Sequence, residues 1–508
     1  MRRRVVRAVG ANGLTSGLAK IVSLLTTLVL ARLLAPEEFG LMALASTVIG
    51  VVGLFNEIGI GAAIVQQPTL RPEAVDGVFG MALIVSAALC ALAVALSWPA
   101  SVFFKLPPLE MVIVVMAFGF FFAAANSVPL ALLRREMRFQ AVLWAGFACV
   151  VAQSLTALLF GWLGYRHWAI VAGFFAGQLV ETLWFWRVSP WRPRWPLQLR
   201  AGRELLGYGL NITASRVLWH LYMNADKMIV GRLMNAHAVG VYDVSRSLAG
   251  LPTSQIAGLV VGIAAPVYAR VQGDPARLQA VQLRLTRGVA YLSFPLLLGI
   301  AAMAEELVAV LLGPQWSEAA LPLRALCGAE MVACIANLQS QLLISTGHVR
   351  RLLRYNLLCT GVMPMAIAAG AWADGLRGVS LAWLSVYPLL ALWLLNEALG
   401  VSKLRYRDFW RAVRQPLGGA LTTAAALLLL RLAFDHGWPE APAALRLAAG
   451  VALGTLVYLA YLVAIDREGV AEVRQVLADI GVPAKALARW PFVRGKRSPR
   501  ADAGGRAP

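Results

Sequence analysis

Apolar residues run along most of the chain in long uninterrupted stretches, and short polar stretches separate them. Each apolar stretch has about twenty residues, the length that crosses a hydrocarbon core about 30 Å thick. A membrane barrel would instead show alternating segments of about ten residues. Because backbone polar groups in lipid must be bonded within their own segment, these stretches are expected to be helices. The pattern predicts an all-α integral membrane protein.

The apolar stretches number about fourteen, and each would form one transmembrane helix. They lie approximately at residues 13–34, 38–63, 77–97, 111–133, 140–162, 166–188, 204–230, 236–265, 286–312, 321–346, 352–373, 377–400, 416–434 and 444–465. The composition agrees, since 59% of the residues are hydrophobic and 14% are charged. A typical soluble domain carries about a quarter charged residues.

The distribution of Lys and Arg predicts the orientation in the membrane. With the amino terminus in the cytoplasm, 34 of the 46 Lys and Arg residues fall in cytoplasmic segments and 8 in outer connections or helix ends. Short cytoplasmic loops of membrane proteins carry such an excess of positive charge. We therefore expect an even number of spans, with both termini in the cytoplasm.

The net charge of +20 needs an explanation, because a basic chain is often a nucleic-acid binder. Here the basic residues sit in short loops beside the spans, and the tail RGKRSPR from Arg494 can rest on anionic lipid headgroups. Orientation and contact with anionic membrane lipids account for the charge. No nucleic-acid partner is expected.

The chain repeats itself at an offset of about 200 residues. ARLLAPEEFGLM begins at Ala31 and GRLMNAHAVGVY begins at Gly231, so that Gly40 corresponds to Gly240. Both copies begin on the same side of the membrane, which predicts two parallel six-helix repeats with the substrate site between them. We expect an N-lobe, an interfacial linker, a C-lobe, two extra C-terminal helices and a basic cytoplasmic tail, at residues 1–188, 189–203, 204–400, 401–465 and 466–508.

Nothing in the sequence indicates an enzyme. The five cysteines stand singly within apolar stretches, without metal-ligand or redox spacing. The sequence contains no phosphate-binding loop, no HExxH and no nucleophile elbow. The connections are also too short for a soluble catalytic domain. We expect no catalytic residues, no metal site and no cofactor.

Several motifs together resemble those of a known family. They are LARLLAPEEFGLMALA, FNEIGIGAAIVQ, VPLALLRREMRF, NADKMIVGRLMNAHAVGVYDVSRSL and PVYARVQ. The chain is similar to the polysaccharide-exporter branch of the multidrug/oligosaccharidyl-lipid/polysaccharide flippase superfamily, and within it to bacterial lipopolysaccharide biosynthesis exporters of the colanic-acid and teichuronic-acid type. The resemblance implies two lobes around a central cavity, and translocation of undecaprenyl-pyrophosphate-linked oligosaccharide across the inner membrane. It also implies a polysaccharide polymerase and glycosyltransferases as partners.

Polar faces on two equivalent helices are candidates for the cavity wall. At about 100° per residue, Lys20, Ser23 and Thr27 share one face of the span at 13–34. One face of the span at 204–230 likewise holds Thr213, Arg216, His220, Asn224 and Lys227. Ionisable groups within spans usually face a bundle interior or a watery cavity. Arg would hold a pyrophosphate by bidentate donation, and Lys would hold it as a point charge. The candidate substrate-binding residues are Lys20, Arg216, His220, Asn224, Lys227 and Arg246.

Each of these candidates also has a structural interpretation. Arg246 could pair with Asp243, three residues earlier on the same helix. His220 could be a packing residue, and Asp226 and Lys227 could make helix-end contacts only.

Carboxylates within spans raise the question of energy coupling. A carboxylate in low dielectric holds its proton more tightly, which suits ion or proton coupling. Glu57 and Asp226 are the candidates for this role, although Glu57 could instead cap or bend its helix. No motif distinguishes proton, sodium or membrane-potential coupling.

Other functions stay open beside the polysaccharide exporter. A multidrug or cation antiporter of the same superfamily would share the lobes, but its cavity should be dominated by acidic residues, whereas cations predominate here. A flippase for the peptidoglycan lipid precursor would also have fourteen spans and a cationic cavity. A membrane-bound glycosyltransferase would need a sizeable loop with catalytic acids, which this chain lacks.

Overall fold

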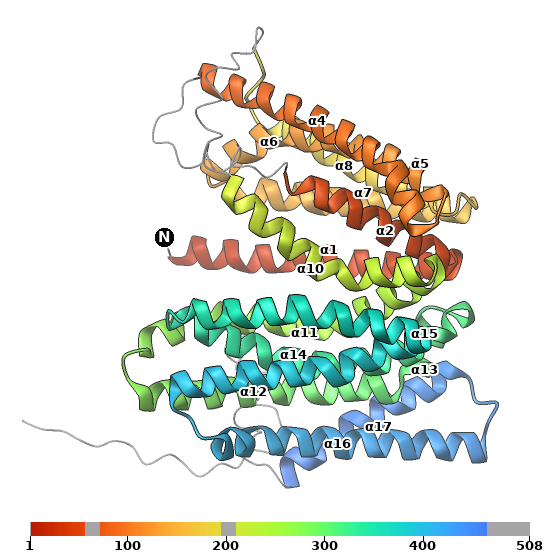
Figure 1. Ribbon diagram of the computed structural model, residues 1–508, viewed down its shortest axis with the longest axis vertical. Coiled ribbons are helices and arrows are strands. Elements are labelled where there is room, and N and C mark those ends of the chain that lie inside the picture. Colours follow the sequence, from red (N-terminus) through yellow and green to blue (C-terminus); the bar gives the residue numbers. More distant parts are fainter. Residues whose placement is uncertain (1, 56–63, 65–71, 195–209, 465–508) are drawn as a thin grey trace, which may run out of the picture.

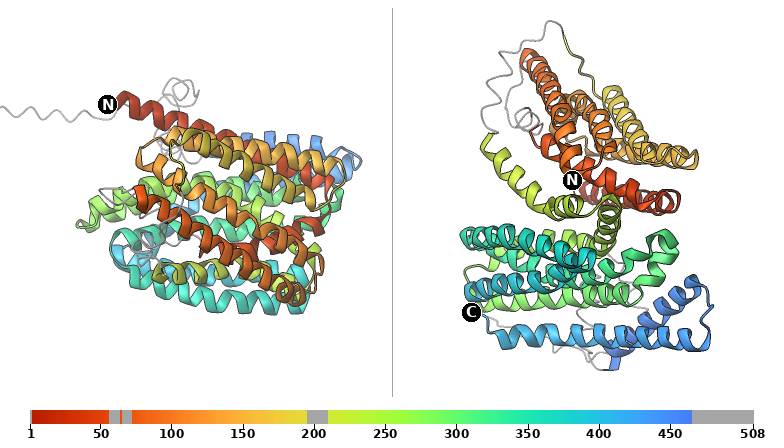
Figure 2. Two further views of the ribbon diagram at one scale, coloured as in Figure 1. Left: turned by 90° about the horizontal axis from the view of Figure 1, so that it is seen from above. Right: turned by 45° about the vertical axis from the view of Figure 1, so that its right-hand side comes forward.

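The computed structural model describes residues 2–55, 64, 72–194 and 210–464. Every regular element in this part of the chain is a helix. The helices lie in two groups, one made by the N-terminal half of the chain and one made by the C-terminal half (Figures 1 and 2). The all-α architecture expected from the apolar pattern is therefore confirmed.

The N-terminal group contains the helices before the first long connection. They are α1 (Arg2–Leu33), α2 (Pro36–Gly53), α4 (Pro72–Phe104), α5 (Pro108–Ala117), α6 (Gly119–Arg135), α7 (Phe139–Trp162) and α8 (Trp168–Val188). Within this group α7 packs along both α1 and α8, and α4 packs against α5 and α6. One side of α2 packs on α5, which leaves its other side for the second group.

The C-terminal group contains the remaining helices. They are α10 (Leu210–Leu233), α11 (Ala236–Val271), α12 (Pro275–Ala302), α13 (Ala304–Leu311), the 3-10 helix η1 (Pro314–Ala319), α14 (Ala320–Ser345), α15 (Val349–Ser402), α16 (Tyr406–Gly437) and α17 (Ala443–Ala464). The centre of this group is α14, which packs on α11, α12 and α15. The last two helices, α16 and α17, lie on the side away from the N-terminal group (Figure 1).

Eleven segments of the described residues are long and apolar enough to cross a membrane, and the chain is a multi-pass membrane protein. The charge-bearing helices α10 and α11 have spanning length as well, with 24 and 36 residues. The count of fourteen spans, the twofold repeat and the lobe boundaries stay predictions. The predicted cytoplasmic tail at 466–508 lies outside the described residues.

The last two predicted spans of the C-lobe are joined within α15 without a separate loop. The chain leaves the helical conformation there only at Asp374 and at Gly375, which has a φ of 55°. Gly370 and Gly378 lie in backbone contact across this bend. Eight residues of straight helix would separate them by about 12 Å, so the chain must turn back sharply at this point.

Local sequence explains where several helices begin. Pro36, Pro108 and Pro275 occupy the first turn of α2, α5 and α12, where a missing backbone N–H removes no helical hydrogen bond. Asn235 caps α11, because its side chain accepts a hydrogen bond of 2.8 Å from the backbone N–H of Ala238. Asn235 belongs to the NAHAVG connection of the sequence repeat, so the repeat motif itself starts α11.

The two groups of helices meet at the first turns of α2 and α11. Gly40 faces the carbonyl oxygen of Ala236, and Gly240 faces the carbonyl oxygen of Pro36. A Cβ atom at either glycine would overlap the opposite backbone. The two contacts are reciprocal and involve residues at the repeat offset of 200, which is what a twofold relation between the halves would produce. Small residues permit this close approach of helices in a membrane.

Polar contacts also join the two groups of helices at this end of the molecule. The indole N–H of Trp316 in η1 donates to the carbonyl oxygen of Ala31 at the end of α1, at 2.7 Å. His237, in the first turn of α11, contacts Glu37 of α2 through Nδ1 at 2.8 Å and Glu318 of η1 through Nε2 at 3.2 Å. This end, where α1 passes to α2 and α10 passes to α11, is called the crossing end below.

Replacing Gly40 or Gly240 with alanine is expected to lower the melting temperature of the detergent-solubilised protein. The added methyl group must push two backbones apart, and overpacking of this kind costs about 1–3 kcal/mol. Thermal unfolding followed by intrinsic fluorescence gives the comparison. Gly146→Ala in α7 is the matched control, because a Cβ atom there meets nothing within 4 Å. Equal melting temperatures for all three variants would show that the crossing is not tight.

Candidate functional site

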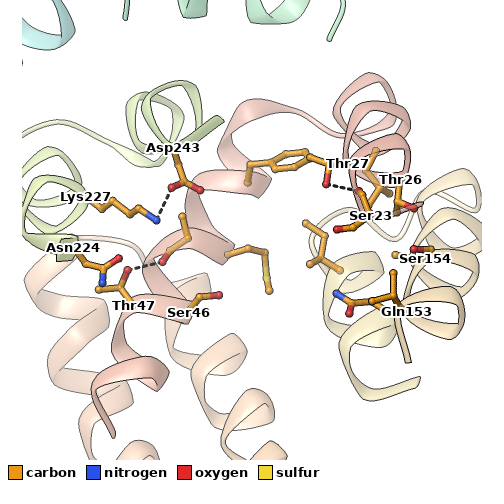
Figure 3. A pocket seen from close by; sticks show the side chains of 17 residues that line it. Ser23, Thr26, Thr27, Ser46, Thr47, Gln153, Ser154, Asn224, Lys227 and Asp243 are labelled. Carbon is orange, nitrogen blue, oxygen red and sulfur yellow. Dashed lines mark hydrogen bonds and ion pairs between the residues drawn. The ribbon is translucent and has the colours of Figure 1, made fainter. Parts of the chain in front are cut away.

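A cavity of about 370 Å³ lies between the two groups of helices, next to the crossing of α2 and α11. Its walls come from α1, α2, α7 and α8 on one side and from α10 and α11 on the other. The polar side chains that line it are Ser23, Thr26, Thr27, Ser46, Thr47, Gln153, Ser154, Asn224, Lys227 and Asp243 (Figure 3). Apolar side chains such as Leu30, Phe39, Met42 and Ile170 complete the lining, so the cavity combines polar and apolar surface.

Hydroxyl and amide groups form the wall contributed by the N-terminal group. The Thr27 hydroxyl donates to the carbonyl oxygen of Ser23 at 3.0 Å, and the Thr47 hydroxyl donates to the carbonyl oxygen of Ala43 at 2.8 Å. Because each proton is used within its own helix, the acceptor lone pairs of the hydroxyl stay available. Such a wall suits a neutral ligand that is rich in hydroxyl donors.

Charge is confined to the opposite wall. Among the described residues that line the cavity, Lys227 and Asp243 are the ionisable ones. Lys227 Nζ lies 2.5 Å from Asp243 Oδ1, and the two side chains are 20% and 25% exposed (Figure 3). Asn224, one turn before Lys227, donates from its amide to the His220 carbonyl oxygen at 2.9 Å. This wall therefore offers an amide and a cation that already has a partner.

A second ion pair joins the same two helices without lining the cavity. The Arg246 guanidinium binds the carboxylate of Asp226, whose side chain is 2% exposed. The Tyr242 hydroxyl donates to the same carboxylate at 2.7 Å. The Arg246 guanidinium also lies over the ring of Trp383, 5.0 Å from its centroid. Asp226 and Arg246 thus belong to a buried polar cluster inside the C-terminal group.

The partner suggested for Arg246 by helical spacing is wrong. Arg246 and Asp243 stand three residues apart on α11, but Arg246 binds Asp226 and Asp243 binds Lys227. Consecutive residues of a helix point about 100° apart, so Asp226 and Lys227 of α10 face different surroundings. The first is turned into the C-terminal group and the second is turned into the cavity.

Lys20 and His220 lie at the boundary between the two groups, outside the 370 Å³ cavity. Lys20, on an exposed face of α1, donates to the side-chain oxygen of Gln255 in α11 at 3.1 Å. His220 of α10 packs on Gly50 of α2, where a Cβ atom would lie 2.6 Å from the imidazole Cε1. Its Nε2 is buried and has no hydrogen-bond partner among the described residues. Both side chains face the opposite half of the molecule.

The structure does not describe the side chains of two predicted site residues. Glu57 lies between α2 and α4, and the side chain of Arg216 in α10 is not described. Their roles stay predictions.

Besides Thr26, which stands next to Thr27, four uncharged polar residues that line the cavity were not singled out from the sequence. They are Ser46, Thr47, Gln153 and Ser154. Each adjacent pair interrupts an otherwise apolar span, but serine and threonine are common in spans because they can bond to their own helix. The sequence signal for these residues is therefore weak.

Comparison with known proteins shows which family has this sequence pattern. The profile of a family described as "Polysaccharide biosynthesis protein" matches residues 29–321, which include the parts of α2, α7, α8, α10 and α11 that line the cavity. The chain belongs to this polysaccharide biosynthesis protein family. The resemblance found in the sequence motifs is thereby confirmed.

Relatives within or near this family match most of the chain. The succinoglycan biosynthesis transport protein ExoT of Rhizobium meliloti is 25% identical over 475 residues, covering 92% of this chain and 94% of ExoT. The lipopolysaccharide biosynthesis protein WzxC of Escherichia coli is 22% identical, covering 70% and 73% of the two chains. The teichuronic acid biosynthesis protein TuaB of Bacillus subtilis is 23% identical, covering 80% and 84%.

Two solved structures of other proteins have a similar fold. The lipid II flippase MurJ, in an inward closed conformation, matches with a TM-score of 0.69 at 12% identity, covering 90% of this chain and 99% of MurJ. An inward-facing multidrug transporter of the MATE family matches with a TM-score of 0.61 at 18% identity, covering 75% and 96%. The helix arrangement is that of a membrane transporter.

Removing one charge of the buried pair of Asp226 and Arg246 is expected to destabilise the protein much more than removing both charges. Asp226→Asn removes the carboxylate that the guanidinium binds, and breaking one side of a buried pair costs about 3–5 kcal/mol. The double variant Asp226→Leu/Arg246→Met removes both charges and should recover most of the lost melting temperature. Asp408→Asn is the control, because its pair with Arg411 is exposed at 3.5 Å. A double variant as unstable as Asp226→Asn would count against this explanation.

Proposed function

We propose that the protein moves a lipid-linked oligosaccharide from the inner to the outer leaflet of a bacterial cytoplasmic membrane. The cargo would be undecaprenyl pyrophosphate that carries a unit of a surface polysaccharide. The observation that carries this proposal is the cavity between the two halves, which places Lys227 and Asn224 opposite a wall of hydroxyl and amide groups. Membership of the polysaccharide biosynthesis family supports the cargo class.

The two walls of the cavity suit the two polar parts of such a headgroup. A lysine ammonium group binds a phosphate as a point charge, and Asn224 can add a hydrogen bond from its amide. Sugar hydroxyls can donate to Thr27, Thr47, Ser154 and the Gln153 side chain, which line the other wall. The polyprenyl tail would stay in the lipid beside the protein, because a cavity of about 370 Å³ has no room for a long polyprenyl chain beside the headgroup.

The proposed mechanism is alternating access of the two halves. The excess of Lys and Arg in the predicted cytoplasmic loops makes the crossing end the outer end, with both termini in the cytoplasm. The headgroup would then enter from the opposite end, where Lys20 and Arg216 are proposed to meet the pyrophosphate first. His220, about two turns before Lys227 on α10, would line the path to the cavity. Arg246 would act indirectly, because it lies beside the cavity and its pair with Asp226 holds α10 to α11.

Energy coupling is proposed at Glu57 and Asp226. Asp226 joins α10 to α11 through Arg246, so protonation of this carboxylate would loosen the two helices that carry the charged cavity wall. The protein would act as a transporter without a catalytic step of its own. Glycosyltransferases that build the cargo and a polymerase that consumes it are the proposed functional partners.

Lys227→Gln is expected to reduce transport about tenfold or more, because a hydrogen bond to a charged group is worth about 1.5–3 kcal/mol. The substitution removes the cation while nearly preserving the length of the side chain. A strain that lacks the gene is complemented with each variant. The pool of lipid-linked oligosaccharide should rise, and surface polysaccharide should fall.

The matched control is Lys403→Gln, which removes an exposed cation at the end of α15, away from the cavity. It should restore transport like the wild type. A Lys227→Gln strain with normal pools and normal polymer would sink the cavity assignment. If the deletion leaves the lipid-linked pool unchanged but raises sensitivity to cationic drugs, the protein is an antiporter. Accumulation of the peptidoglycan lipid precursor would instead identify that precursor as the cargo.

A further inference from the structure

The cation that faces the cavity is already neutralised by the protein itself. Lys227 Nζ lies 2.5 Å from the carboxylate of Asp243, so the two groups form a direct, charge-assisted pair. Both residues line the cavity, and both side chains are only partly exposed. An anionic ligand that reaches Lys227 therefore meets an occupied site, and its binding is an exchange with Asp243.

Asp243 is a strong competitor because it is part of the same protein. It sits on α11, a helix held to α10 by the neighbouring pair of Arg246 and Asp226. A group that is tethered beside its partner acts at a high effective concentration. A free ligand must therefore offer more charge, or more simultaneous contacts, than one carboxylate does.

The surroundings of the pair add no net positive charge. In the described parts of α10 and α11 beside the cavity, Lys227 is balanced by Asp243, and Arg246 is balanced by Asp226. The other polar residues that line the cavity are neutral hydroxyls and amides. A singly charged headgroup thus gains little by entering, because it can only replace one carboxylate with another single charge.

We infer that Asp243 is a specificity-determining residue that excludes phosphodiester lipids from the cavity and admits pyrophosphate lipids. A disubstituted pyrophosphate carries twice the negative charge of a phosphodiester headgroup, so it can displace the carboxylate and still contact Asn224. This inference rests on the proposed function, since it assumes a pyrophosphate headgroup. Bulk anionic phospholipid is the competitor that such a protein always meets.

The experiment measures binding of two probes to the purified full-length protein in detergent. The probes are an undecaprenyl pyrophosphate that carries a single sugar, which is a disubstituted pyrophosphate, and phosphatidylglycerol; tryptophan fluorescence reports binding. Wild type should strongly prefer the pyrophosphate. Asp243→Asn keeps the size of the side chain and a hydrogen-bonding oxygen but removes the charge. It should bind phosphatidylglycerol about tenfold more tightly and should lower the preference ratio about tenfold, which is a shift of about 1.4 kcal/mol.

Three further variants separate selectivity from a structural role. Asp243→Glu should retain the wild-type ratio, because it retains the charge. The double variant Lys227→Gln/Asp243→Asn should lose the gain in phosphatidylglycerol binding, since that gain needs the cation. Asp408→Asn, an exposed carboxylate on α16, is the control. If Asp243→Asn does not yield folded protein, Asp243→Ser tests the same charge removal.

The outcomes distinguish this inference from the proposed function. A wild type that prefers the pyrophosphate, together with an unchanged ratio in Asp243→Asn, overturns the role of Asp243 and leaves the proposed function standing. Equal loss of both affinities in Asp243→Asn means that the residue is structural, which also overturns the inference. A wild type without any preference for the pyrophosphate lipid overturns the proposed function itself.

Discussion

The close approach of α2 and α11 at Gly40 and Gly240 sets the geometry on which the site depends. A single Cβ atom at either position would separate the backbones, and van der Waals packing is a main source of attraction between helices in lipid. The two halves therefore meet backbone to backbone at the crossing end. The cavity lies directly beside this contact, lined by Phe39 and Met42 of α2 and by Asp243, about one turn after Gly240 on α11. One contact thus closes one end of the boundary between the halves and fixes where the polar space lies.

Low dielectric then decides how the charges of α10 and α11 are arranged. A charged side chain within a span is costly unless it finds a partner or water. Two ion pairs satisfy this requirement, Asp226 with Arg246 and Lys227 with Asp243, and both bridge the same two helices. Sliding α10 past α11 would break both pairs at once, so together they fix the register of the helices. Because of the same requirement, Lys227, the cation that lines the cavity, already has a partner before any ligand binds. Binding becomes an exchange of partners.

Sequence periodicity predicted the all-α class, most helix positions and the placement of Lys227 and Asn224 on a cavity wall. Those features depend on spacing within one helix, which a sequence displays directly. Asp243 was the wrong partner for Arg246 because the carboxylate that Arg246 binds, Asp226, lies on α10, and spacing along α11 gives no information about α10. The wall that contains Gln153 was missed for the same reason. Its amide joins the site only because α7 packs along α1, a tertiary fact without a local signature.

The contacts at the crossing end differ in the free energy that is needed to break them. The pairs of His237 with Glu37 and Glu318 involve carboxylates that are 52% and 65% exposed, and exposed ion pairs contribute only about 0–1 kcal/mol. Water can replace such contacts at little cost if the halves rock apart. The glycine contact lies between the halves with reciprocal geometry, so it would be close to any twofold axis and would move least. A ligand shifts such an equilibrium only by its differential affinity for the two arrangements. The exchange at Lys227 frees Asp243, which lies about one turn from Gly240 on α11, so the difference in affinity acts close to the contact between the halves.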